Sequence, residues 1–329
     1  MTVKIAMVGL GRWAMFLGAA LMETEGVELT GGYDSSLQSA ENFAEMFEVP
    51  AVADLAAIAG DPEVDAVVVA TANHTHHQVV KTLLQAGKDV FVEKPLANSL
   101  AECRELIDLA RERKRVLMVG HNSRRYPAVR KLKELIDAGK IGQVHSATAI
   151  FSYENLADIS TDTWRNDPAK CPGGPLMQLA VHQADNLLWL LGPVESVSCQ
   201  LMAPVPGGKV PAGGRLGLKF ASGALGVLES DYLTTPESFS ITLRGEKGEF
   251  QSRGPGHVKI WDSSGQVESL DLGRDDSLRQ QMAEFVACVR DRVPPETGGE
   301  VGIAALALIV AGLESAELGR PVEVGGYDD

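Results

Sequence analysis

Apolar residues follow two alternating periods through the first third of the chain. Continuous apolar runs occur in VKIAMVGL, VELTGGYD, VDAVVVAT, KDVFVEKP and RVLMVGH, and helical patterns at residues 38–47, 77–86 and 100–112 separate them, with a weaker strand predicted near 51–53. Runs of Val, Ile and Leu between helices are typical of parallel strands that are covered on both faces. The pattern therefore predicts an α/β fold with a doubly wound domain over residues 1–122.

The pattern changes after residue 122. Helices are predicted at about 127–138, in the stretch CPGGPLMQLAVHQADNLLWLLG, and at about 277–290 and 300–318. Strand and turn signals lie between them in VESVSCQL, GRLGLKF, GALGVLES, FSITLRG, GEFQS, HVKIWDS and QVESLDL, and a short PVEV strand ends the series. Turns at 221–223 and 245–248 join neighbouring strands as hairpins. Residues 123–329 are thus predicted to form an α+β domain on a largely antiparallel sheet.

Composition narrows the range of functions. The chain has 329 residues, 45% of them hydrophobic and 22% charged, and 30 Lys and Arg residues stand against 44 Asp and Glu, which gives a formal net charge of -14. This charge disfavours nucleic acid and membrane surfaces as partners, although a local basic pocket for a phosphate is still compatible with it.

Cysteine usage and apolar runs bear on the compartment. The four cysteines form no CxxC pair, so neither a zinc site nor a disulfide framework is indicated, and reduced thiols in the cytoplasm fit best. The first residues run directly into a strand, and we expect no signal peptide. The longest apolar run, residues 301–313, is too short to cross a bilayer and favours a buried helix.

A glycine-rich turn after the first strand indicates a nucleotide site. The residues Gly9, Gly11, Arg12, Trp13 and Ala14 belong to a GxGxxA fingerprint. In this fingerprint the first glycine permits a tight turn, the second lets a pyrophosphate approach the helix N-terminus, and the alanine keeps the helix close to the strand.

Asp34 strengthens the nucleotide prediction, because it lies 20 residues beyond Ala14 at the end of the next strand, where a carboxylate binds ribose hydroxyls. The alternative is an aspartate that caps the following helix. A carboxylate repels a 2'-phosphate, and Ser35 and its neighbours supply no arginine to receive one, so NAD is favoured over NADP.

A second candidate site lies on the helix of the second domain. Gln178 and His182 are four residues apart near the start of an otherwise apolar helix, so their side chains are expected to project together. A histidine on such a helix is either a core residue or a base, and the preceding glycines favour a site.

Three segments in order resemble the Gfo/Idh/MocA oxidoreductases, a family that includes glucose-fructose oxidoreductase and inositol dehydrogenase. They are GLGRWA, TANHTHHQVVKTLLQAGKDVFVEKPLANS and WRNDPAKCPGGPLMQLAVHQAD, and the likeness extends over essentially the whole chain. The resemblance implies an N-terminal Rossmann domain, a substrate-binding and oligomerisation domain, and hydride transfer between a nicotinamide and a ring hydroxyl of a sugar, cyclitol or sugar derivative.

The resemblance also assigns residues. Glu93 and Lys94 match the EKP motif, whose lysine lies beside the nicotinamide, and Thr71, Asn73 and His76 match a segment that lines the cofactor cleft. His182 matches the proton-accepting histidine, whereas Gln178 stands where the family usually has aspartate. A neutral amide gives this histidine only a dipole and hydrogen bonds, but it can still orient His182 or bind Lys94 or a substrate hydroxyl.

Alcohol oxidation needs a hydride acceptor, a base and charge stabilisation at the oxygen. These roles are assigned to NAD, to His182 and to Lys94, which is also suited to share in a proton relay. Two alternatives share the scaffold: a regulator that binds a dinucleotide and a sugar without turnover, and an enzyme that keeps its cofactor to move hydride between two sugars or to assist elimination.

Other residues have open interpretations. Arg124 either contacts substrate or is a solvated helix charge, and Trp164 and Arg165 either anchor the core or contact substrate. The histidines at 74, 76 and 77 lack a carboxylate at an evident spacing, so no metal site is expected. Apolar strands in the second domain and the family resemblance imply a homodimer or homotetramer.

Overall fold

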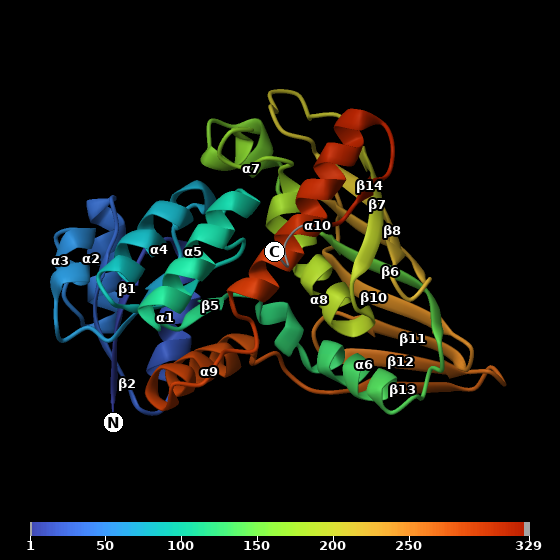
Figure 1. Ribbon diagram of the computed structural model, residues 1–329, viewed down its shortest axis with the longest axis horizontal. Helices are drawn as coiled ribbons and strands as arrows, with labels where there is room; N and C mark the ends of the chain where they lie inside the picture. The colour runs from blue at the N-terminus through green and yellow to red at the C-terminus, as the bar shows by residue number, and fades with distance from the viewer. Residues whose placement is uncertain (1, 326–329) are drawn as a thin grey trace. The chain divides into compact units, whose positions relative to one another are not determined.

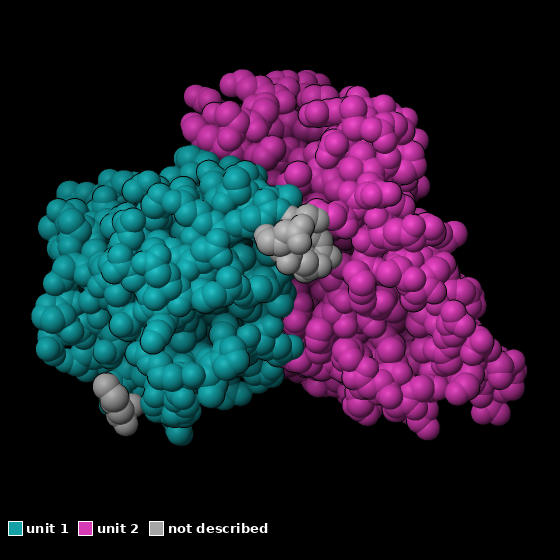
Figure 2. Space-filling view, viewed as in Figure 1, with its two compact units in different colours: residues 1–122, 276–303 teal, residues 123–275, 304–329 magenta. Residues whose placement is uncertain are grey.

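The computed structural model describes residues 2–325 and divides into two compact units (Figure 2). Unit 1 comprises residues 1–122 and 276–303, and unit 2 comprises residues 123–275 and 304–329. The sequence pattern places residues 276–303 in the second domain, whereas in the structure they belong to unit 1.

Unit 1 is built on a five-stranded sheet in which every described strand pair is parallel. Its strands are β1 (Val3–Val8), β2 (Val27–Tyr33), β3 (Ala66–Val69), β4 (Asp89–Val92) and β5 (Leu117–Val119), in the order β2-β1-β3-β4-β5. The order reverses direction between β1 and β3, the switch point at which such sheets bind ligands beyond the carboxyl ends of their strands. The predicted doubly wound domain is confirmed.

Helices cover the strands of unit 1 (Figure 1). They are α1 (Arg12–Met22), α2 (Leu37–Phe47), α3 (Leu55–Gly60), the 3-10 turn Asn73–Thr75, α4 (His76–Gln85), α5 (Leu100–Arg113) and α9 (Ser277–Asp291). A capping box between Ser99 and Glu102 fixes the start of α5. Helix α9 contacts α1 and β1, and its Phe285 packs against Phe91 of β4 with ring centroids 5.8 Å apart.

Unit 2 is built on a nine-stranded sheet within the described residues. Its strands are β6 (Val144–Ser152), β7 (Val194–Leu201), β8 (Gly213–Phe220), β9 (Leu225–Asp231), β10 (Ser238–Gly245), β11 (Gly248–Arg253), β12 (His257–Asp262), β13 (Val267–Asp271) and β14 (Val322–Glu323). They are ordered β13-β12-β11-β10-β6-β9-β8-β7-β14, and among the strand pairs of the described residues only β6–β9 is parallel. The largely antiparallel sheet is confirmed, but the sequence pattern missed its central strand, β6.

The helices of unit 2 lie on one side of this sheet in Figure 1. They include α6 (Pro127–Asp137), α7 (Leu156–Ser160), the 3-10 turn Trp164–Asn166 and α8 (Val181–Leu191). A 3-10 turn at Asn122–Arg125 precedes α6. Helix α6 contacts β11 and β12, and α8 contacts β6, so this side holds the core of the unit.

Helix α10 (Gly299–Leu318) begins in unit 1 and continues into unit 2. Among the described residues it is the one helix long and apolar enough to cross a bilayer, but 56% of its apolar window is buried inside the structure. A core helix of a soluble protein passes the same test, and the predicted burial of residues 301–313 agrees with this arrangement.

Candidate active site

The glycine-rich turn joins β1 to α1 in unit 1. Gly9 has φ +83°, and a Cβ there would lie 2.5 Å from the backbone nitrogen of Thr71, so only glycine fits. Gly11 is the N-cap residue of α1, and a Cβ at this position would meet nothing within 4 Å. The first glycine is thus required by the fold, whereas the second faces open space.

The N-terminus of α1 has no side-chain cap among the described residues and no acidic residue in its first turn. Its first amides therefore remain available to an anion, which the helix dipole also favours. Arg12 and Trp13 begin the helix, and both are exposed. Ala14 is fully buried, which keeps α1 close to the sheet.

Asp34 follows β2 and is tied to the glycine-rich turn. Its Oδ2 accepts a hydrogen bond from the backbone N–H of Leu10 at 2.7 Å, and its Oδ1 accepts one from Ser36 at 2.8 Å. The N-cap of α2 is Ser36, whose hydroxyl accepts a hydrogen bond from the backbone N–H of Ser39. Asp34 is therefore not the capping residue, and Ser35 lies exposed between the two.

Glu93 directly follows β4, and its side chain is buried. Burial raises the pKa of its carboxyl group, opposed by the charge of Lys94 and by hydrogen bonds from Trp13 and from the backbone N–H of Lys94. Its Oε1 has no hydrogen-bond partner within residues 2–325. A Cβ on Gly120 would come within 2.8 Å of this oxygen, so a glycine at the end of β5 makes room for Glu93.

Thr71, Asn73 and His76 follow β3. Thr75 donates a hydrogen bond from its hydroxyl to that of Thr71 at 2.8 Å. Asn73 is 5% exposed, and its Nδ2 has no partner in the described part of the chain. An unpaired buried amide is costly unless a ligand or water satisfies it.

His76 is fully buried and lies between two carbonyl oxygens. Its Nδ1 is 2.8 Å from the oxygen of Pro95, and its Nε2 is 3.1 Å from that of Thr71. Burial, assisted by the charge of Lys94, lowers the pKa of His76 to about 4. The ring is therefore neutral near pH 7.

The residues at the carboxyl ends of β1 to β4 fit a dinucleotide. Open space beyond Gly11, uncapped amides of α1 and the Asp34 carboxylate provide for a pyrophosphate and a ribose. The unpaired Asn73 Nδ2 and Glu93 Oε1 offer a donor and an acceptor to a polar ring. Among the predicted cofactor residues, Arg12 and Ser35 are exposed side chains. The other predicted residues have the contacts, burial or backbone geometry described above.

In unit 2, two glycines with positive φ precede the candidate catalytic helix. Gly173 and Gly174 have φ +74° and +53°, and Cβ atoms there would lie 2.7 Å from Leu313 and 3.0 Å from the backbone oxygen of Pro211. A π-helical turn, Leu176–Ala180, follows them and leads into α8. Such turns frequently occur at functional sites. The sequence predicts a regular helix here, so the π-helical turn is an unpredicted feature.

Gln178 lies in the π-helical turn and is buried. Its Nε2 donates a hydrogen bond to the sulfur of Cys171, at 3.4 Å. The thiol of Cys171 in turn lies 3.8 Å from the backbone oxygen of Gly174. The side chain that replaces the expected aspartate is thus held by the cysteine at the start of the motif.

His182 is 7% exposed and packs edge-on against Phe151, with ring centroids 5.6 Å apart. Phe151 belongs to β6, and Tyr153, just beyond that strand, packs against Tyr232 at 5.5 Å. Burial raises the pKa of Tyr232 well above its usual value. Sequence reasoning missed Phe151 and Tyr153 because it missed β6, although the aromatic spacing in FSY was a possible signal.

Arg124 is buried in unit 2. Its Nε donates a hydrogen bond to Oδ2 of Asp185 in α8 at 3.0 Å, and its Nη2 bonds to Oδ1. Its guanidinium also lies 5.4 Å from the ring centroid of Trp189. Arg124 is therefore not a solvated helix charge, and its partner Asp185 is a further residue that sequence reasoning missed.

Trp164 and Arg165 lie in a 3-10 turn beyond α7. The Arg165 guanidinium is 4.4 Å from the Trp164 ring centroid, and its Nε is 3.3 Å from Oδ2 of Asp158. The next residue, Asn166, is buried and donates to the backbone oxygen of Thr161 at 2.9 Å. Asn166 thus anchors this loop, while the Trp164–Arg165 pair stays half-buried.

The three neighbouring histidines do not converge. His77 Nε2 is 2.6 Å from Glu105 Oε2, whereas His76 faces backbone carbonyl groups. Within the described residues, no group of three or more His, Cys, Asp or Glu side chains has the arrangement of a metal site.

Comparisons with known proteins identify both halves of the chain. Residues 3–121 match a family described as "Oxidoreductase family, NAD-binding Rossmann fold", and residues 129–251 match the "GFO/IDH/MocA C-terminal domain". The chain is 28% identical to 1,5-anhydro-D-fructose reductase of Ensifer adhaerens, over 96% of this chain and 99% of that protein.

Two further relatives are also named as oxidoreductases or dehydrogenases. Myo-inositol 2-dehydrogenase of Thermotoga maritima is 30% identical, and the match covers 80% of this chain and 81% of that protein. A crystal structure from Desulfitobacterium hafniense, of a protein described as an NADPH-dependent oxidoreductase, has 29% identity and a TM-score of 0.93, with 98% of each chain covered.

Proposed function

The chain belongs to the Gfo/Idh/MocA family of oxidoreductases, and on this premise we propose that it transfers a hydride between NAD and a ring hydroxyl of a sugar, cyclitol or sugar derivative. The oxidoreductase class predicted from the sequence is confirmed by this membership. Relatives named for anhydrofructose and inositol support a carbohydrate or polyol substrate.

One observation carries the proposal: buried polar atoms lie at the carboxyl ends of the parallel strands beside an uncapped helix N-terminus. Asn73 Nδ2 and Glu93 Oε1 have no partner within the described residues, and Gly11 faces open space. Buried polar atoms without partners are rare in native proteins, and a bound ligand is a common explanation.

Bound nicotinamide would supply the hydride acceptor for alcohol oxidation. In our proposal the imidazole of His182 removes the hydroxyl proton, and the ammonium of Lys94 stabilises the oxygen as negative charge develops on it. Gln178 orients the substrate or His182. Arg124, Trp164 and Arg165 bind or orient the substrate, and the ion pair with Asp185 holds Arg124 in place.

For the cofactor we propose NAD rather than NADP. The Asp34 carboxylate follows β2, where it favours ribose hydroxyls and repels a 2'-phosphate, and residues 35–37 are Ser, Ser and Leu. Because the D. hafniense relative is described as NADPH-dependent, both cofactors must be compared directly.

The first experiment is a panel of polyols, sugars, sugar phosphates and nucleotide sugars, assayed by nicotinamide absorbance with NAD and NADP separately. We expect turnover with a polyol or sugar and a higher kcat/KM with NAD. Failure of every substrate despite measurable NADH binding would contradict the proposed reaction, and a preference for NADP would contradict the cofactor choice.

Variants then test the two proposed catalytic residues. Lys94→Ala and His182→Ala are each expected to lower kcat by about 100-fold or more, because general acid–base groups contribute on that scale. NADH affinity, measured by fluorescence titration, should change little. Lys140→Ala and His145→Gln, which alter exposed residues, are the matched controls. A variant with normal turnover would remove its residue from the mechanism.

We also propose that the chain forms a homodimer or homotetramer through the face of the unit 2 sheet that helices do not cover in Figure 1. Light scattering coupled to gel filtration at micromolar concentration tests this proposal. A single monomer peak would contradict it.

A further inference from the structure

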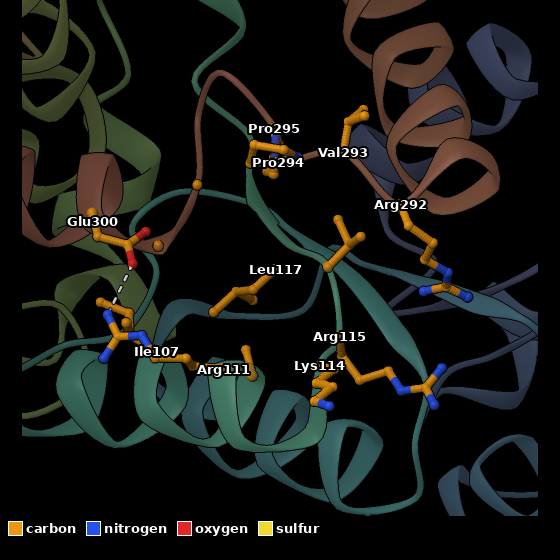
Figure 3. A pocket seen from close by; sticks show the side chains of 14 residues that line it. Ile107, Arg111, Lys114, Arg115, Leu117, Arg292, Val293, Pro294, Pro295 and Glu300 are labelled. Carbon is orange, nitrogen blue, oxygen red and sulfur yellow. Dashed lines mark hydrogen bonds and ion pairs between the residues drawn. The ribbon is translucent and has the colours of Figure 1, made fainter.

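A cavity of about 610 Å³ lies in unit 1 beside the amino end of β5 (Figure 3). The last turn of α5, the start of β5 and the connection from α9 to α10 enclose it. Parallel strands carry the dinucleotide residues at their carboxyl ends, so this cavity adjoins the opposite edge of the same sheet. None of the residues predicted for cofactor or substrate binding lines it.

The cavity combines an apolar surface with basic residues. Its apolar part includes Ile107, Val116, Leu117, Pro294 and Pro295. Four cationic residues, Arg111, Lys114, Arg115 and Arg292, line it together with one carboxylate, Glu300. In a chain of net charge -14, this local excess of positive charge favours an anionic ligand.

Arg111 already has partners. Its Nη1 bonds to Asp108 at 3.1 Å and its Nη2 to Glu300 at 3.4 Å, as the dashed line in Figure 3 shows for the second contact. It also lies in the last turn of α5, where the helix dipole favours a cation. Arg111 is therefore explained by the fold and is not assigned to a ligand.

Arg292 and Arg115 are only partly explained by the fold. Nη1 of Arg292 donates to both oxygens of the buried Asp89, at 2.9 and 2.7 Å, and within residues 2–325 its Nε and Nη2 have no acceptor. The Nε of Arg115 is buried and also has no partner in the described chain. A buried donor without an acceptor costs about 1–3 kcal/mol, so a ligand or water is expected beside it.

These two guanidinium groups extend toward the same side of the view in Figure 3, away from Arg111 and Glu300. Both act on the carboxyl group of Asp89, where their positive charges oppose the rise in its pKa that burial causes. Lys114 is the exposed C-cap residue of α5 and adds a third cation to the lining of the cavity. The cations with available donors are thus Lys114, Arg115 and Arg292.

We propose that this cavity is a second ligand site, which binds a small organic anion with an apolar ring. The carboxylate or phosphate group accepts hydrogen bonds from Arg115 and Arg292 and is attracted by Lys114. The ring packs on Leu117, Val116 and the two prolines. No covalent step is involved, and the site is independent of the proposed hydride transfer.

The test is isothermal titration calorimetry on enzyme saturated with NADH, so that the dinucleotide site does not compete for the probe. The probes are phenyl phosphate, benzoate and inorganic phosphate. We expect saturable one-to-one binding of phenyl phosphate or benzoate, and the tighter of the two identifies the anion. Inorganic phosphate should bind at least about tenfold more weakly than phenyl phosphate, because it lacks the apolar ring.

Variants locate the binding. Arg115→Gln should lower the affinity for the probe about tenfold, and Lys114→Gln should lower it about threefold. Arg113→Gln is the matched control, because Arg113 belongs to the same basic run but does not line the cavity. Thermal unfolding confirms that each variant folds. If Arg115→Gln fails to fold, Lys114→Gln still tests the site, because Lys114 is exposed.

Three results would overturn the proposal. The first is that no probe gives a saturable heat of binding. The second is that Arg113→Gln and Arg115→Gln lose equal affinity for the probe. The third is that inorganic phosphate binds as tightly as phenyl phosphate. Unchanged affinity in both Arg115→Gln and Lys114→Gln would move the binding elsewhere and would overturn it equally.

Discussion

The hydrogen bond from Gln178 to Cys171 gives a physical reason for an amide at the position where the family usually has aspartate. An ionised aspartate only accepts hydrogen bonds, whereas Gln178 Nε2 donates one to the sulfur at 3.4 Å. Both residues are buried, so a carboxylate there would be poorly solvated. Cys171 and Gln178 therefore form a matched pair.

Replacing this amide tests whether it influences the catalytic base. In Gln178→Asp, the added carboxylate lies four residues from His182 and favours the protonated form of a nearby base. We expect the acidic limb of the pH dependence of kcat/KM to move to higher pH. Gln178→Asn, which keeps the amide, is the control. An unchanged profile in Gln178→Asp would mean that the two side chains do not communicate.

His76 makes stability depend on pH. Burial lowers its pKa to about 4 in the folded chain, against 6.5 when it is exposed. Between these pH values the unfolded chain binds a proton at His76 that the folded chain does not bind. The contribution of the neutral His76 to the free energy of unfolding is therefore fully present above pH 6.5 and is lost as pH falls toward 4. The full effect is about 3 kcal/mol.

Urea unfolding at intervals from pH 4.5 to pH 7.5 measures this contribution. Between pH 6.5 and 4.5 the free energy of unfolding should fall less steeply in His76→Asn than in the parent chain. The two slopes should differ by about 1.4 kcal/mol per pH unit. His145→Gln, at an exposed position, is the control variant. Parallel slopes in the parent and His76→Asn would show that His76 titrates normally.

At the scale of elements, the turn from β1 to α1 separates a glycine needed for folding from one needed for binding. A Cβ on Gly9 would collide with the Thr71 backbone, and its φ of +83° disfavours any other residue. A Cβ on Gly11 would meet nothing within 4 Å, and its φ is -70°. The same substitution should thus have different effects two residues apart.

We expect Gly9→Ala to lower the free energy of unfolding by about 1–3 kcal/mol. Gly11→Ala should leave stability within about 0.5 kcal/mol of the parent but weaken NADH binding tenfold or more, because its methyl group occupies the space beside the α1 amides. Thermal unfolding and fluorescence titration measure the two effects, and each variant is the control for the other. Equal NADH affinity in Gly11→Ala and the parent would place the pyrophosphate elsewhere.

The elements that sequence reasoning found are those with strong apolar periods. β1, β3 and β4 are almost entirely buried, and their Val and Ile runs marked them clearly. β6 was missed because its inward residues are small: Ala147 and Ala149 are buried where α8 contacts the strand. Small residues allow a helix to approach closely but carry little hydrophobic signal.

The candidate site shows the same division. Fingerprint and motif residues such as Gly9 and Asp34 are recognisable because their chemistry depends on spacing along the chain. Asp185 acts through a partner distant in sequence, Arg124, so no local pattern reveals it. Phe151 packs on the distant His182, and the aromatic spacing in FSY was its one local signal. The π-helical turn at Gln178 depends on packing and was also not predictable.

At the scale of the whole chain, unit 1 is discontinuous, because residues 276–303 return to a sheet whose strands all lie before residue 122. Local periodicity predicts that α9 is a helix but not which sheet it covers. In the structure four apolar residues of α9, Met282, Phe285, Val286 and Val289, are part of the core around α1 and β1. Burial of each contributes about 1.5–3 kcal/mol, so together they approach the net stability of a domain.

A fragment of residues 1–122 should therefore lack a cooperative unfolding transition. A second fragment, in which a short Gly/Ser linker joins residue 122 to residues 276–303, should unfold cooperatively in urea and bind NADH. The junction is short because Asn122 Nδ2 donates a hydrogen bond to Ser277 Oγ at 3.2 Å. Trp13 is the one tryptophan of both fragments, so its fluorescence follows unfolding without interference.

Phe285→Ala in the joined fragment is the control for packing. It should lower the free energy of unfolding by about 3–5 kcal/mol, because Phe285 is fully buried and packs against Phe91. If residues 1–122 alone unfolded at the same urea concentration as the joined fragment, α9 would be peripheral to unit 1. Loss of the transition only in the shorter fragment would instead show that the dinucleotide domain is completed by chain that follows β6 to β13 of the unit 2 sheet.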